Sequence, residues 1–151
     1  MKKLILILLV VLTAFPVMSQ TKKEVVSKFE IRSLRLTSEY RKMIDLDKND
    51  TTYKVVVIFQ NLKYSSLVDF QMLSFSNQED LAQFLVDLKK ALPEIGNKTA
   101  LDWNRKNYSL ALFEFDNTLH MYDDRHLGYT CLNNKQTEKF ISWVETIQMS
   151  K

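Results

Sequence analysis

Apolar residues recur at helical spacing in two stretches of the chain. Across residues 77–92 the apolar positions are Leu81, Phe84, Leu85, Leu88, Ala91 and Leu92. Ser76 and Glu79 match a capping box before this run, and Pro93 follows it. Across residues 134–149 the apolar positions are Phe140, Ile141, Val144 and Ile147, preceded by Asn133 as a cap. The spacing predicts two amphipathic helices, each with one face against a core.

Runs of β-branched and aromatic residues predict strands between and before these helices. They cover residues 52–60, 68–75, 108–115, 118–122 and 127–132. Asp116 and Asn117 predict a tight hairpin turn. Beyond residue 19 the only Gly and Pro residues are Pro93, Gly96 and Gly128, so we expect no linker and a single domain over residues 20–151. The pattern predicts an α+β fold, with an antiparallel sheet that carries both helices on one face.

The chain also matches itself weakly at a shift of 56 residues. The shift places Phe59 on Phe115, Asn61 on Asn117, Asn77 on Asn133 and Phe84 on Phe140. Two strand-strand-helix repeats would give this pattern, and so would two units that only share a period. Alternate residues of a strand share a face. The odd-numbered strand residues are therefore the predicted core side: Val55, Val57, Phe59, Leu73, Phe75, Ala111, Phe113, Phe115, Tyr129 and Cys131.

The opposite strand faces are also apolar and need a cover. They carry Val56, Ile58, Leu110 and Leu112, and an exposed side chain of this kind forfeits about 1.5–3 kcal/mol. The cover is residues 25–46, a second subunit or a ligand. Residues 25–46 fit a helix in part and strand fragments in part. We expect this segment to pack on the apolar face, because that needs no partner.

The first nineteen residues have the pattern of a bacterial export signal. Lys2 and Lys3 precede an apolar run over residues 4–12, and Val17 and Ser19 suit a cleavage site. The run is too short to span a bilayer as a helix. We expect cleavage after Ser19, a periplasmic or secreted protein, and no stable membrane insertion afterwards.

Charge and cysteine content narrow the function further. Removal of Lys2 and Lys3 lowers the formal net charge from +3 to +1, because residues 1–19 contain no acidic residue. A nearly neutral surface gives no electrostatic footprint for nucleic acid, so we expect no such partner. Cys131 is the only cysteine, which excludes an intramolecular disulfide.

Two arrangements leave room for an enzyme. His120, Asp123, Asp124 and His126 supply nitrogen and oxygen atoms of the kind that bind transition metals, although the spacing is no known signature. A four-residue hairpin loop would place His120 opposite Tyr129 and diagonal to Cys131, which allows a Cys–His dyad. The competing interpretation is a polar turn beside a buried structural cysteine. We expect no metal and no cofactor.

The aromatic residues favour a binding role instead. Tyr53, Tyr64, Trp103, Tyr108 and Tyr122 are placed to present rings at strand ends and loops. The expected ligand-binding residues are Tyr64, Tyr122, Asp123, Asp124, Arg125 and His126. We therefore expect a noncatalytic binding or protein-interaction domain, monomeric or homodimeric, for an unknown protein or small ligand. The alternative is a small periplasmic enzyme that uses His120 with Cys131, or with a metal at the turn of residues 123–126.

Overall fold

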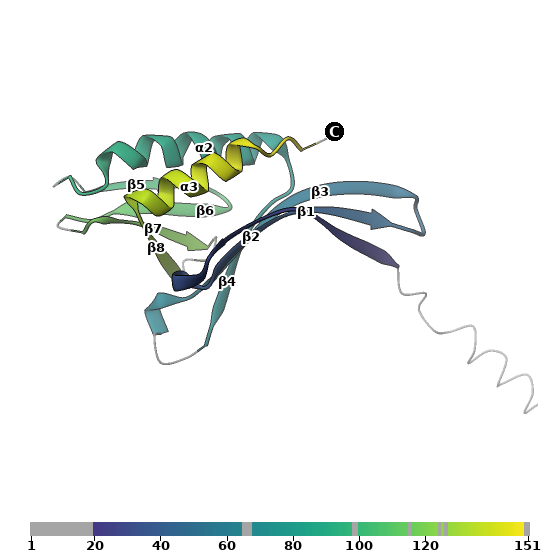
Figure 1. Cartoon of the computed structure of the whole chain (residues 1–151), viewed down its shortest axis with the longest axis horizontal. Helices are drawn as coiled ribbons and strands as arrows, with labels where there is room; N and C mark the ends of the chain where they lie inside the picture. The colour runs from purple at the N-terminus through teal and green to yellow at the C-terminus, as the bar shows by residue number, and fades with distance from the viewer. Residues whose placement is uncertain are drawn as a thin grey trace, which may run out of the picture.

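The computed structural model describes residues 20–64, 68–97, 100–114, 116–123, 125 and 127–149. These residues form two antiparallel four-stranded sheets and two helices, which confirms the α+β class (Figure 1). The first sheet has the order β1 (Thr21–Ile31), β2 (Leu36–Asp45), β3 (Asp50–Gln60) and β4 (Phe70–Phe75). The second has the order β5 (Leu101–Asn104), β6 (Tyr108–Leu112), β7 (Thr118–Asp123) and β8 (Tyr129–Asn133). The helices are α2 (Gln78–Ala91) and α3 (Asn134–Glu145), and short 3-10 turns are η1 (Arg32–Leu34), η2 (Leu62–Tyr64) and η3 (Leu92–Glu94).

Each sheet is a meander of four strands followed directly by a helix. Both helices begin at an asparagine cap. The Asn77 side chain accepts a hydrogen bond from the Asp80 amide at 2.8 Å, so Asn77 caps α2 and not Ser76. The Asn133 side chain accepts one from the Gln136 amide at 2.9 Å, and the Gln136 side chain bonds back to the Asn133 amide. The repeated unit in the described chain is thus four strands and a helix, longer than the pattern of two strands and a helix that the sequence predicts.

Both helices lie side by side on one side of the second sheet, and the far ends of β1, β2 and β3 extend beyond them (Figure 1). A single hydrophobic cluster draws on both sheets and both helices. At its centre the ring of Phe84 lies 4.8 Å from the rings of Phe75 and Tyr108 and 6.0 Å from that of Phe140, between centroids. Phe84 and Phe140 are both fully buried, as the matching helices predict.

The predicted core face is right in the first sheet and wrong in the second. Val55, Val57 and Phe59 are fully buried. In the second sheet Leu110 and Leu112 face the core instead, and Phe113 is 45 % exposed. Ala111, Tyr129 and Cys131, predicted on the core face, are also partly exposed. Phe115 lies outside the described residues.

The core face of the second sheet is reversed because the distance from the last inward strand residue to the helix cap differs by one residue between the two sheets. In β4 the last inward residue, Phe75, precedes the cap Asn77 by two positions, whereas in β8 Leu132 precedes Asn133 by one. Because successive strand residues point to opposite faces, this single residue reverses every side chain of the second sheet. A shift that aligns the helices therefore misplaces the strands.

Residues 25–46 do not cover an apolar sheet face. They belong to β1 and β2, which extend the first sheet beyond β3 by antiparallel pairing, with Val56 opposite Glu39. Two neighbours on the outer face of that sheet, Phe70 and Met72, are 49 % and 53 % exposed. Leu110 and Leu112 need no such cover, because they belong to the core beneath the helices.

An ion pair between a buried carboxylate and a partly exposed arginine joins α2 to the turn that follows β5. The carboxylate of Asp87 is fully buried and accepts hydrogen bonds from Arg105 Nε at 2.7 Å and Nη2 at 3.0 Å. Tyr108 Oη and Gln83 Nε2 also donate to it, each at 2.9 Å. Burial alone would raise the pKa of Asp87, but the hydrogen bonds from Arg105 and Tyr108 outweigh it and hold this pKa below its usual range. Asp87 is thus a structural carboxylate.

A second polar contact joins the two sheets at the start of β8. The side chain of Asn61, at the end of β3, donates to Asp69 Oδ2 at 2.8 Å and accepts from the Tyr129 amide at 3.3 Å. A Cβ atom on Gly128 would lie 2.5 Å from the Asn61 side chain, so only glycine fits there. This close approach fixes where Tyr129 enters the second sheet.

Residues 1–19 lie outside the described part of the chain, and so does the predicted export signal. Within the described part, neither helix has the length and apolar character that crossing a membrane requires.

Candidate functional site

The face of the second sheet that points away from the helices, here called the outer face, gathers chemically diverse side chains. Two rows of directly opposite residues cross all four strands. One row is Asp102, Ala111, His120 and Cys131, and the next is Asn104, Ser109, Tyr122 and Tyr129. Opposite residues in an antiparallel sheet lie within contact distance on the same face. The outer face therefore brings carboxylate, amide, imidazole, phenol and thiol groups together.

Four rings on this face pack against one another. His120 lies at their centre, with its ring 4.8 Å from that of Phe113, edge to face, and 5.2 Å from that of Tyr129, stacked. The rings of Tyr122 and Tyr129 are 5.5 Å apart. Such contacts hold each ring in one orientation before any ligand arrives. We call Phe113, His120, Tyr122 and Tyr129 the aromatic cluster.

Beside the aromatic cluster the outer face is hollowed. Ala111 and Ser109 are small, and they lie between larger residues on both neighbouring strands. The result is a hollow of about 360 Å³ above β5 and β6. Its floor is Ala111 and Ser109, and its walls include Asp102, Asn104, Phe113 and Tyr122. A volume of this size matches a small ligand.

The charged groups of the outer face are carboxylates. Asp102 Oδ2 accepts a hydrogen bond from the Asn104 side chain at 3.0 Å. Asp116, on the loop between β6 and β7, contacts His120 Nε2 at 2.5 Å and accepts from Thr118 Oγ1 at 2.7 Å. Partial burial works to raise the pKa of Asp116, but these two hydrogen bonds outweigh it and lower the pKa. No lysine or arginine occupies an outward strand position of β5 to β8 among the described residues.

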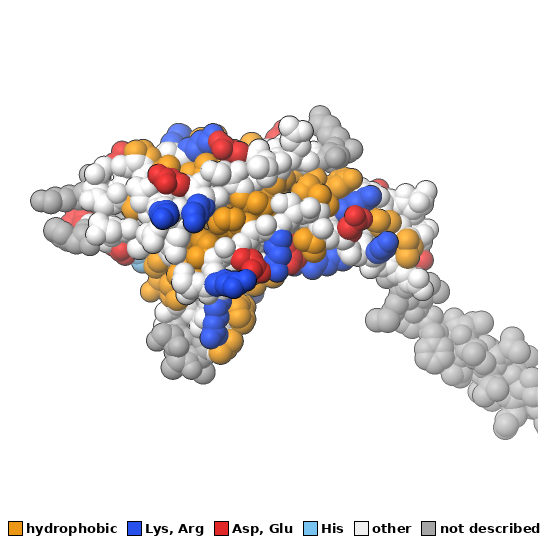
Figure 2. Space-filling model, viewed as in Figure 1, with side chains coloured by type: hydrophobic (Ala, Val, Ile, Leu, Met, Phe, Trp, Pro, Cys, Tyr) orange, Lys and Arg blue, Asp and Glu red, His pale blue; other side chains and the backbone are white. Residues whose placement is uncertain are grey.

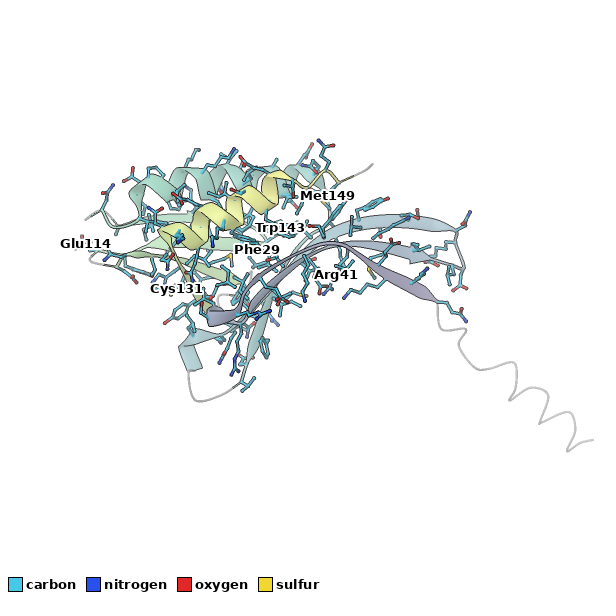
Figure 3. The ribbon with its side chains drawn as sticks, in the orientation of Figure 1. Phe29, Arg41, Glu114, Cys131, Trp143 and Met149 are labelled. Atoms are coloured by element: carbon cyan, nitrogen blue, oxygen red, sulfur yellow. The ribbon has the colours of Figure 1, made fainter. Side chains whose placement is uncertain are left out.

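Cys131 and His120 are in contact, as the dyad hypothesis requires. The sulfur lies 3.6 Å from both ring nitrogens of His120. The two residues are directly opposite and not diagonal, because Tyr122 pairs with Tyr129 and the loop between them has six residues instead of four. Cys131 lies on β8, on the side of the second sheet away from the helices (Figure 3).

The environment of Cys131 does not activate its thiol. Partial burial is the main cause that raises the pKa of Cys131 to about 11, and the Asp116 carboxylate adds to it. The thiolate is the nucleophilic form, and at neutral pH this pKa leaves the thiol protonated. Proximity to His120 is therefore not enough for a nucleophilic dyad.

We expect alkylation of Cys131 by iodoacetamide to be slow at pH 7 and to rise about tenfold per pH unit up to pH 9.5, without a plateau. His120→Phe should leave this pH profile unchanged, because the imidazole does not activate the thiol. The measurement is the alkylation rate from intact mass, with a cysteine peptide of pKa about 8.5 as reference. A rate that levels off below pH 8 in the wild type, and not in His120→Phe, would restore the dyad.

Two of the four side chains in the metal hypothesis lie on opposite faces of β7. His120 and Asp123 are three positions apart on β7, so His120 points outward and Asp123 points into the core. The buried Asp123 accepts a hydrogen bond from the Leu127 amide at 2.9 Å, and Arg125 Nε lies 3.6 Å from its other oxygen. Asp124 and His126 are outside the described residues. In the part that the structure describes, no three metal-binding side chains converge.

The remaining predicted binding residues lie in different parts of the fold and do not form one site. Tyr122 joins the outer face, but Arg125 lines a different depression with Met72 and Ser74 of β4. Tyr64 ends η2, which lies beside β8. Tyr108 presents no ring to solvent, because it is buried and bonded to Asp87.

Sequence reasoning missed the residues that shape the hollow: Asp102, Asn104, Ala111 and Phe113. The sequence signal for β5 was a short one: apolar and polar residues alternate over the four positions 101–104, and a polar turn follows directly. No protein-family model, curated protein or solved structure matches the chain. A function can therefore be inferred only from the fold and from the outer face of the second sheet.

Proposed function

We propose that this protein is an exported, noncatalytic binding protein that holds a small ligand in the hollow on the outer face of the second sheet. The observation that carries the proposal is the hollow itself, where Ala111 and Ser109 leave space between an aromatic wall and a carboxylate wall. Small-molecule sites are concave and mostly apolar, with a few polar groups that fix orientation. The hollow has these properties.

The rings support binding because they are already fixed. His120 contacts the ring of Phe113, and Tyr129 contacts the ring of Tyr122. Because these contacts already order the two rings, binding a ligand loses little side-chain conformational entropy. Across the hollow, the hydrogen bond between Asn104 and Asp102 orients the carboxylate in the same way. A preorganised surface of this kind favours recognition.

Two further arguments complete the proposal. The raised pKa of the Cys131 thiol argues against the enzymatic alternative that uses His120 and Cys131. The two lysines, the apolar run over residues 4–12 and the small residues before Gln20 support export to the periplasm or beyond.

The test is to fill the hollow. Ala111→Leu places a larger side chain on its floor without touching the core, because Ala111 points outward. In a small-molecule screen followed by amide NMR shifts, we expect hits to perturb residues around Ser109, Ala111 and Tyr122. Ala111→Leu should weaken these hits at least about tenfold, a loss of about 1.4 kcal/mol.

The matched control is Ala82→Leu, the same change at an exposed position of α2. It should leave both binding and thermal stability unchanged. Hits that map elsewhere and bind Ala111→Leu as tightly as the wild type would refute the hollow as the binding site.

A further inference from the structure

We infer that the ligand of this hollow presents an organic cation, an ammonium group that carries an apolar shell such as three methyl groups. The inference rests on the proposed function and adds the chemical class of the ligand. It follows from the charge of the outer face and from the rings that wall the hollow.

The charge on this face has one sign. Asp102 lines the hollow, and only one of its two oxygens accepts the hydrogen bond from Asn104. An ionised carboxylate accepts at about four lone-pair positions, so Asp102 keeps capacity for a ligand. Asp116 is a second carboxylate next to the aromatic cluster, where Thr118 and His120 contact it and lower its pKa. Glu114 is also exposed, at the end of the second sheet (Figure 3), but it does not line the hollow.

Among the described residues no basic side chain pairs with Asp102, whereas Asp116 is already paired with His120. The outward strand positions described in β5 to β8 carry neither lysine nor arginine. An anionic ligand would meet repulsion there, whereas a cation would be attracted to Asp102 at short range. Charge thus selects the sign of the ligand.

The rings select the chemical form of the cation. Phe113 and Tyr122 line the hollow opposite the carboxylate side, and the faces of such rings attract cations. A bare ammonium is strongly hydrated, which opposes transfer into a hollow with an apolar floor. A methylated ammonium makes apolar contact with Ala111 and the rings and keeps its charge for Asp102. The hollow therefore suits a cation with an apolar shell better than a compact one.

The experiment compares choline with 3,3-dimethyl-1-butanol, which replaces the charged nitrogen by carbon and keeps the shape. Both are titrated into the mature protein and followed by the amide signals of Ser109 and Ala111. We expect choline to bind at least about tenfold more tightly than the neutral analogue, with the difference reduced at high salt. Asp102→Asn should weaken choline at least about fivefold and leave the neutral analogue unchanged.

Glu114→Gln is the matched control, because it removes the same charge from a residue that does not line the hollow. It should change the affinity for choline less than about twofold. Equal affinities for choline and the neutral analogue would overturn the cation inference. The proposed function would survive that result if Ala111→Leu abolished both.

Two other results would also be decisive. If neither probe binds, but a neutral sugar from the screen binds in a manner sensitive to Ala111→Leu, the cation inference is wrong and the binding role stands. If no compound in the screen perturbs the hollow, both proposals fail together.

Discussion

Phe84→Ala is expected to destabilise the protein by about 3–5 kcal/mol. Phe84 is fully buried, and its ring contacts those of Phe75, Tyr108 and Phe140 at the point where both helices and both sheets meet. Truncation removes apolar contact and leaves a cavity that rigid neighbouring rings cannot close. The loss is comparable with the whole stability of many domains, about 5–15 kcal/mol.

Denaturant unfolding followed by circular dichroism measures this loss. The matched control is Phe113→Ala, the same truncation at a residue 45 % exposed on the outer face, which should cost less than about 1 kcal/mol. A cost below about 1 kcal/mol for Phe84→Ala would be inconsistent with its central place in the core.

Asp87→Ala should cost about 3 kcal/mol at pH 7, because it leaves the Tyr108 hydroxyl and the Arg105 guanidinium without their shared acceptor. This value is the lower end of the destabilisation expected when a buried ion pair loses one partner, because Arg105 is 41 % exposed and water screens its charge. Unfolding curves at pH 7 give the value. Glu138→Ala, at an exposed position of α3, serves as the control and should stay within about 0.5 kcal/mol of the wild type.

The same site predicts a pH dependence. Because the folded pKa of Asp87 lies below its unfolded value of about 3.9, its ionisation stabilises the fold above that value and the contribution is lost as pH falls through the folded pKa. The stability gap between the wild type and Asp87→Asn should therefore narrow from pH 7 to pH 3. A gap that stays constant over this range would show that the charge of Asp87 does not stabilise the fold.

The sequence predicts the helices well because their signals are local. Apolar spacing and the cap signals at Ser76 and Asn133 place α2 and α3 to within a few residues, although Asn77 is the actual cap of α2. The strands β1 and β2 give no such signal, since the outer half of β1 is exposed on both faces and lacks the alternation of a half-buried strand. Antiparallel pairing, of β1 with β2 and of β2 with β3, makes them strands.

The candidate site was predictable only where it lies within one hairpin. His120, Tyr122 and Cys131 belong to β7 and β8, and their common face follows from pairing between neighbouring strands. The hollow depends on β5, which has only four residues, and on the small size of Ala111. An alanine in a strand is no signal by itself. Ala111 indicates a hollow only when the larger residues opposite it on the two neighbouring strands are known.

The contact between α3 and β1 has a consequence for how the chain folds as it is made. Phe29 of β1 stacks on Trp143, whose ring Nε1 donates to Ser27 Oγ at 2.9 Å. Figure 3 labels both residues where α3 meets the first sheet. Tyr40 Oη reaches the carbonyl of Gln148, and hydrophobic side chains gather along this boundary in Figure 2.

These partners are more than a hundred residues apart in the sequence. While a ribosome extends the chain, the part of β1 and β2 that packs on α3 therefore stays uncovered until α3 has emerged. Partly made chains that expose such surface are prone to aggregate. We therefore expect the nascent protein to need a holding chaperone until α3 is made, although the strands of the described residues pair with near neighbours in the sequence.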